Sequence, residues 1–96
     1  MALRALVIDS QDNVANLVGE GKSGQEVECE VEGGETKRVT LQDDVPLYHK
    51  FALVEIETGE RVCKYGHTIG KATRDIREGQ HVHAHNIESL RGRGDR

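Results

Sequence analysis

The first half of the chain alternates apolar and polar residues with the period of a β-strand. In residues 25–32, three apolar residues fall on one face and four glutamates fall on the other, which predicts a strand with one buried face. The apolar run at residues 4–9 predicts an earlier strand. A glycine pair at 33–34 predicts a hairpin turn into a further strand at residues 36–41. We therefore expect short strands joined by tight turns.

An eight-residue pattern occurs twice in the second half. Residues 55–62 and 75–82 both read acid-Ile-x-x-Gly-polar-x-Val. We expect each isoleucine to anchor a single helical turn, each glycine to allow a left-handed exit and each valine to begin the next strand. Two copies are too few for a solenoid. The repeat instead favours a small pseudo-symmetric β fold with little helix.

Three of the five histidines alternate along one segment, at positions 81, 83 and 85. Residues two apart on a strand point the same way, so we expect His81, His83 and His85 to share a face. Imidazole is the commonest metal ligand and titrates near neutral pH, so this row suits a metal centre or acid–base catalysis. The alternative is a solvated polar face. Adjacent imidazoles lose stability on protonation, which favours a function.

The repeat aligns Cys63 with His83 and Tyr65 with His85. If the two copies fold alike, Cys63 and Tyr65 share a polar face in the other half and could complete a site with the histidines. The alternative for Cys63 is a small buried filler.

A His-Lys pair, His49 and Lys50, follows the only proline, Pro46. Proline fixes a turn, so the pair lies at the entrance of the next strand. It could bind a carboxylate there, or simply face water.

Composition and charge exclude several classes of protein. With 13 Lys and Arg against 17 Asp and Glu, the net charge is −4, and no basic-aromatic surface points to nucleic acid. No apolar run approaches the roughly 20 residues of a membrane span. The two cysteines form no CxxC pair, so we expect reduced thiols and a cytoplasmic protein. Ninety-six residues form one domain, too small to build a whole catalytic cleft unaided.

Four short motifs occur in the order seen in the SAF domain of the altronate and galactarate dehydratase family. They are Asp12-Asn13-Val14-Ala15, His49-Lys50-Phe51-Ala52-Leu53, Lys64-Tyr65-Gly66-x-x-Ile69-Gly70 and His81-Val82-His83-Ala84-His85-Asn86. The chain resembles this family from about Leu6 to Asn86. The resemblance implies a mainly β, β-clip fold like that of type III antifreeze proteins, over residues 1–88, with a flexible tail at residues 89–96.

The resemblance also implies a function. The domain is expected to be the separate small subunit of an altronate-type hydro-lyase, inactive alone and working with a large dehydratase subunit. The reaction is loss of water from a sugar acid such as altronate, which gives a 2-keto-3-deoxy acid. Two alternatives stay open: the small subunit of a sulfolactate sulfo-lyase, and a non-catalytic binding module for a protein or carbohydrate. A homo-oligomer in isolation is also possible.

The resemblance assigns roles to the polar residues of these motifs and implies a divalent metal, Fe²⁺ or Mn²⁺. The catalytic set is His83, His85 and His49; the substrate-binding set is Lys50, Tyr65 and Asn86; the metal set is His83, His85 and His81. One departure concerns Tyr48, where the family usually has glycine directly before the His-Lys pair. If that position needs a positive φ, Tyr48 would alter the turn or narrow the site.

Overall fold

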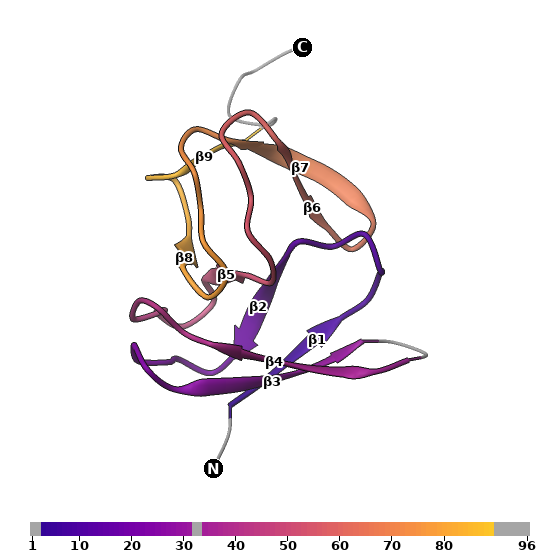
Figure 1. Cartoon of the computed structure of the whole chain (residues 1–96), viewed down its shortest axis with the longest axis vertical. Helices are drawn as coiled ribbons and strands as arrows, with labels where there is room; N and C mark the ends of the chain where they lie inside the picture. The colour runs from indigo at the N-terminus through magenta and orange to yellow at the C-terminus, as the bar shows by residue number, and fades with distance from the viewer. Residues whose placement is uncertain (1–2, 32–33, 90–96) are drawn as a thin grey trace.

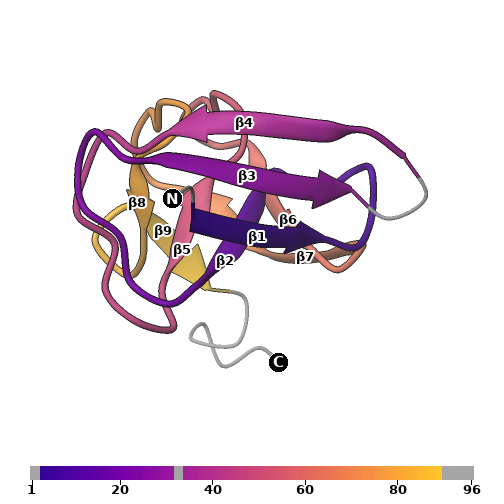
Figure 2. The same cartoon turned by 90° about the horizontal axis from the view of Figure 1, so that it is seen from below.

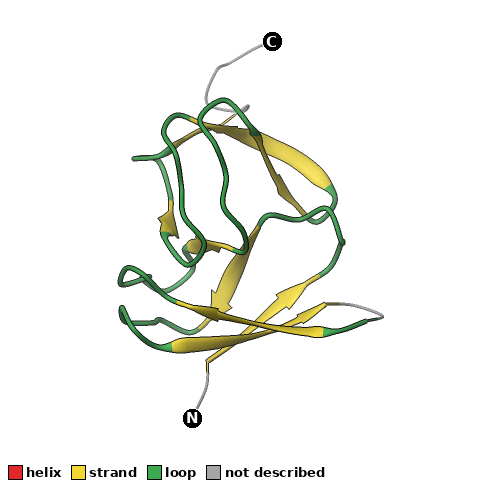
Figure 3. Cartoon of the chain, in the orientation of Figure 1, coloured by secondary structure: helices red, strands yellow, loops and turns green. Residues whose placement is uncertain are grey.

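The chain is built from short β-strands (Figure 1). The computed structural model describes residues 3–31 and 34–89, and within them it contains nine strands and no helix (Figure 3). The strands are β1 (Leu3–Val7), β2 (Val14–Val18), β3 (Glu26–Val31), β4 (Thr36–Thr40), β5 (Lys50–Ala52), β6 (Arg61–Lys64), β7 (His67–Ala72), β8 (His81–Val82) and β9 (Ile87–Ser89). The expected mainly β fold is confirmed. Of the expected tail at residues 89–96, only Ser89 lies within the described residues.

The strands form two sheets, of order β4-β3-β1-β2-β5-β8 and β6-β7-β9. Paired strands are antiparallel except for β1 and β3, which run parallel because β2 carries the chain back between them. Figure 2 shows β4, β3 and β1 side by side. The strand expected from the alternation at residues 25–32 is β3, in which Val27 and Cys29 are buried and Glu26 is exposed.

Two hydrophobic cores lie on opposite faces of the β2–β5 ribbon. Residues Ala15 and Phe51 are paired across the ribbon and face the first core, whereas Val14 and Ala52 are paired and face the second. This division follows from strand geometry, because successive side chains point to opposite faces. The first core also holds Ala5, Val7, Leu17, Val27, Cys29, Val39, Leu41, Val45 and Leu53, and the second holds Ile56, Val62, Ala72, Ile76 and Val82.

The repeat seen in the sequence occurs four times in the structure, at residues 21–26, 45–50, 56–61 and 76–81. Each copy begins with a residue in an isolated β-bridge, continues through a four-residue turn and enters a strand. The bridges join the copies in pairs, residue 21 to 45 and residue 56 to 76.

The single helical turns expected at the isoleucines are wrong. Ile56 donates its N–H to the carbonyl of Ile76 at 2.8 Å, and Ile76 donates back to Ile56 at 2.7 Å. These reciprocal bonds make the two residues partners in a short antiparallel bridge. Both side chains are fully buried in the second core, so each isoleucine is an anchor of the sheet.

Each turn closes with a hydrogen bond from its fourth residue to the carbonyl of its first, and its third residue has a positive φ, as in a type II turn. That third residue is Gly24, Gly59 and Gly79 in three copies, with φ of 92°, 89° and 89°, and Tyr48 in the other, with φ of 70°. Glycine adopts this conformation freely and tyrosine does not. The position of Tyr48 therefore does require a positive φ, and the turn accepts tyrosine at an energetic cost.

Replacing Tyr48 with glycine should stabilise the isolated chain by about 0.5–1 kcal/mol. The left-handed conformation costs a non-glycine residue about 1–2 kcal/mol, which glycine removes. Glycine also raises the conformational entropy of the unfolded chain, which offsets part of this gain in stability. Little packing is lost, because Tyr48 is 80% exposed. Urea unfolding measures the change. Leu47→Gly is the control: Leu47 is exposed in the same turn without a positive φ, so its loss should be slightly destabilising. Equal effects of both substitutions would contradict strain at Tyr48.

Candidate metal and acid–base site

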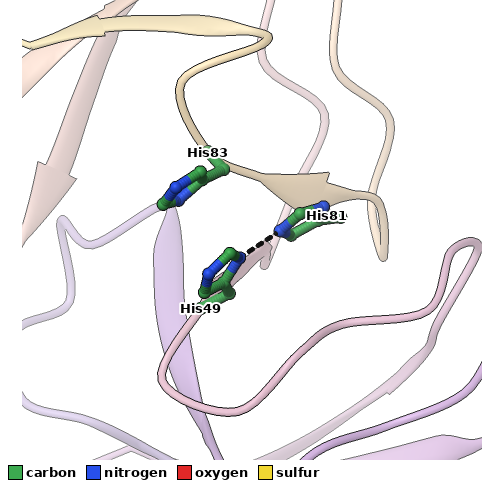
Figure 4. Close-up of side chains that lie close together, drawn as sticks. All are labelled: His49, His81 and His83. Carbon is green, nitrogen blue, oxygen red and sulfur yellow. Dashed lines mark hydrogen bonds between the residues drawn. The ribbon is translucent and has the colours of Figure 1, made fainter.

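Three imidazoles from two neighbouring strands meet at one edge of the larger sheet (Figure 4). His49 directly precedes β5, His81 begins β8 and His83 directly follows β8. The rings of His49 and His83 stack with centroids 4.0 Å apart and planes 11° apart, and Nδ1 of His49 lies 2.7 Å from Nε2 of His81. Because β5 and β8 are paired, residues far apart in the sequence are held side by side here.

The sequence of the preceding turn explains why the side chain of His49 is available. In the other three copies, the fourth turn residue accepts the N–H of the first through its side-chain oxygen: Gln25 from Lys22, Glu60 from Glu57 and Gln80 from Arg77. In this copy the first turn residue is Pro46, which has no N–H. His49 therefore has no N–H within its own turn to accept, and its ring contacts the neighbouring histidines instead.

The strand expected to carry all three alternating histidines is shorter than predicted, because β8 ends at Val82. The chain then turns, and Asn86, which is 4% exposed, holds the turn together. Its Oδ1 accepts the His83 N–H at 3.0 Å and its Nδ2 donates to the His81 carbonyl at 2.8 Å. The side-chain amide of Asn86, expected to bind substrate, thus serves to position the histidine segment.

The turn tilts the ring of His85 out of the stacked arrangement. Its ring centroid lies 5.0 Å from that of His81 but the planes are tilted by 38°. One ring nitrogen from each of His49, His81 and His83 lies within 4.8 Å of the others, so these three could hold a metal ion. The structure therefore gathers His49 in the place where the sequence suggested His85 as a third ligand.

The surroundings favour the neutral form of His81 and His83. Burial is the main factor that lowers the pKa of His81, and the nearby His85, His49 and His83 lower it further, while Asp43 opposes the shift. The pKa of His83 is also lowered, by desolvation first and then by His49, Lys50 and His85. Neutral imidazole is the form that binds metal ions, so these shifts leave a lone pair available near pH 7.

A half-buried lysine lies beside the histidines. Burial lowers the pKa of Lys50, and the ammonium of Lys64 lowers it further. Lys50 pairs across the strands with Asn16, whose Oδ1 is buried and has no hydrogen-bond partner in the described part of the chain. Sequence reasoning missed Asn16, because only the β2–β5 register places it opposite Lys50.

The remaining candidates lie on another hairpin. Tyr65 and Gly66 form the two-residue loop between β6 and β7, with φ of 56° and 78°, and the Asp12 carboxylate accepts the Gly66 N–H at 2.8 Å. In Figures 1 and 2 this loop lies on the opposite side of the molecule from β8. The Cys63 Sγ lies 3.9 Å from the Thr68 hydroxyl. The structure therefore does not bring Cys63 and Tyr65 to the stacked histidines.

Comparison with known proteins identifies the family of the chain. Residues 3–90 match the family described as the altronate/galactarate dehydratase SAF domain. The chain belongs to this family. Altronate dehydratase of Escherichia coli is 43% identical over 87 residues, which are 91% of this chain and 17% of that protein. The alpha subunit of (2R)-sulfolactate sulfo-lyase from Chromohalobacter salexigens is 34% identical over 93 residues, 95% of this chain and 99% of that subunit.

Altronate dehydratase of Bacillus subtilis is 34% identical over 82 residues and shares 16% of its length. The SAF domain thus spans about a sixth of the altronate dehydratases that it matches, and nearly all of a lyase subunit. Within residues 3–31 and 34–89 there is no helix able to cross a membrane.

The geometry of this SAF domain makes Asn86→Ala a test of the histidine turn. The substitution leaves the His83 N–H and the His81 carbonyl without their side-chain partner, and we expect a loss of about 2 kcal/mol in the free energy of unfolding. Denaturant unfolding measures it. Asn13→Ala is a matched control, because Asn13, which directly precedes β2, also bonds two backbone groups, the Cys63 N–H and the Arg61 carbonyl of β6. Both should destabilise, but only Asn86→Ala should shift the NMR signals of the stacked histidines.

Proposed function

We propose that this SAF domain is one part of a two-chain sugar-acid hydro-lyase of the altronate type. The observation that supports this most strongly is the cluster of His49, His81 and His83, which share one edge of the sheet in a member of the altronate/galactarate dehydratase family. The cluster is open to solvent at His83. Its chemistry therefore requires a second surface, which a large dehydratase subunit would provide.

On this proposal, His49, His81 and His83 would hold a divalent ion such as Fe²⁺ or Mn²⁺ after their rings turned from the stacked arrangement to face one point. Metal–imidazole bonds are about 2.0–2.1 Å long, so one ion can join nitrogens that lie within a few ångströms of one another. His49 and His81, whose Nδ1 and Nε2 lie 2.7 Å apart, would be two of the residues that hold the ion. When bound, it would stabilise the negative charge that develops on the acid as the α-proton leaves.

Residues beside this cluster supply the remaining roles. The Lys50 ammonium would hold the carboxylate of the sugar acid, because it is half-buried and no carboxylate within the described residues forms a salt bridge with it. His85, exposed and outside the stack, would move a proton between the substrate and solvent or the large subunit. The reaction needs one base, which removes the poorly acidic α-proton, and one acid, which protonates the leaving hydroxyl.

The sulfo-lyase alternative rests on a separate observation. The alpha subunit from C. salexigens matches this chain along 99% of its own length and is named as a subunit. The same site could serve a sulfonated acid, since a sulfonate and a carboxylate both bind an ammonium. We propose dehydration first because the family that matches residues 3–90 is described as the altronate/galactarate dehydratase SAF domain.

The test combines this chain with the large dehydratase subunit of the same organism. Each chain alone and the mixture are assayed with D-altronate, galactarate and (2R)-sulfolactate, by 2-keto-3-deoxy acid formation and by sulfite release. We expect turnover of altronate only by the mixture. Sulfite release instead would select the sulfo-lyase, and turnover of altronate by either chain alone would refute the two-chain proposal. Association without turnover of any of the three acids would favour a binding module.

A further inference from the structure

The turn that leads to His49 carries an aromatic residue that the fold itself does not need. Tyr48 holds the positive-φ position that glycine holds in the other three turns. Its side chain is 80% exposed, and no hydrogen bond or ring contact within the described residues involves it. Residues kept in a strained conformation mark functional sites when nothing in the chain explains them. Tyr48 therefore points to a contact outside this chain.

The neighbourhood of Tyr48 narrows the kind of contact. Leu47, the other central residue of the turn, is 48% exposed, so the tip of the turn presents two apolar side chains together. The next residue is His49, whose ring stacks on His83. The apolar tip and the histidine cluster are thus adjacent along the chain, so a surface that covers the cluster can also reach the tip.

The size of the relatives identifies the occupant. This SAF domain corresponds to 17% of the E. coli altronate dehydratase, so most of such an enzyme lies outside the part that this chain represents. The histidine cluster opens to solvent at His83, and a hydro-lyase site must exclude water to protect its charged groups. The surface that closes it belongs, on the proposed function, to the large dehydratase subunit.

We infer that Tyr48, with Leu47 beside it, is an anchor of the interface with the large dehydratase subunit, at the rim of the histidine site. Tyrosine suits this role because it buries a large rigid surface at low entropic cost and offers a hydroxyl for a hydrogen bond. The side chain is already 80% exposed in the free chain, so it is accessible before binding. This inference rests on the proposed two-chain function and adds the position of the contact.

The experiment measures affinity for the large dehydratase subunit of the same organism, by calorimetry or surface plasmon resonance. Tyr48→Gly and Tyr48→Asn should weaken the complex by at least about tenfold, although both residues tolerate a positive φ. The control is Val54→Asn, since Val54 is also an exposed apolar residue but follows β5, whereas Tyr48 lies before it. Its affinity should stay within about twofold.

Each outcome decides the inference. If the wild-type chain binds and Tyr48→Gly binds equally well, the anchor is refuted while the two-chain function stands. If the wild-type chain does not bind the large subunit at all, both fail. Sedimentation of the isolated chain tests a second copy as the occupant: a dimer that Tyr48→Gly dissociates would overturn the assignment to the large subunit.

Discussion

Replacing His49 with alanine is expected to weaken metal binding by at least about 100-fold, because it removes one of three imidazoles that converge within 4.8 Å. Zn²⁺ is a suitable probe, since imidazole sites bind it more tightly than Mn²⁺ or Fe²⁺. Calorimetric titration of the folded chain measures the affinity. His83→Ala should act similarly, because His83 belongs to the same set.

The discriminating control is His85→Ala. The alternation in the sequence places His85 with His81 and His83, whereas the structure places His49 there. His85→Ala should therefore change Zn²⁺ affinity by only a few-fold, as should His67→Ala on the exposed β7 hairpin. A greater loss from His85→Ala than from His49→Ala would overturn the cluster.

The largest expected effect on stability is that of Gly79→Ala, at about 3 kcal/mol or more. The left-handed φ alone costs alanine about 1–2 kcal/mol. A Cβ at this position would also lie 2.1 Å from the backbone carbonyl oxygen of Thr40, so the strands would have to separate. The Gly79 N–H and carbonyl bind Ala52 and Gln42 at 2.9 Å each, and these bonds would be strained as well.

Gly59→Ala separates the two causes. Gly59 has the same φ of 89° in an equivalent turn, but a Cβ there would have no atom within 4 Å. It should lose only the conformational part, about 1–2 kcal/mol. Urea unfolding of both variants gives the difference between their free energies of unfolding, provided that the dependence of that free energy on urea concentration is the same. Equal losses would show that the structure relaxes freely around Thr40.

The local features of the fold could be predicted and the long-range ones could not. The burial of Val27 and Cys29 follows from an alternation contained in one strand. The parallel pairing of β1 with β3 could not be predicted from either strand alone, because it depends on the path of the chain through β2 between them. The sequence pattern did not reveal two of the four turns. Gly21 stands in place of the isoleucine in one, and in the other Val45 replaces the isoleucine and Tyr48 replaces the glycine, although the backbone conformation is the same.

The same distinction applies to the site. His81 and His83 are two residues apart, and the sequence correctly suggested that they lie together. His49 joins them only through the pairing of β5 with β8. A proline was the one local sign of its different role, because Pro46 removes the N–H that occupies the equivalent side chain in the other turns.

The pairing of the four turns also links the cluster to the stability of the whole chain. His49 belongs to the pair joined at residues 21 and 45, and His81 to the pair joined at residues 56 and 76. The two rings meet only when both pairs have formed and docked. An ion bound between them is therefore a ligand of the complete native state, and by mass action it shifts the unfolding equilibrium of both halves together.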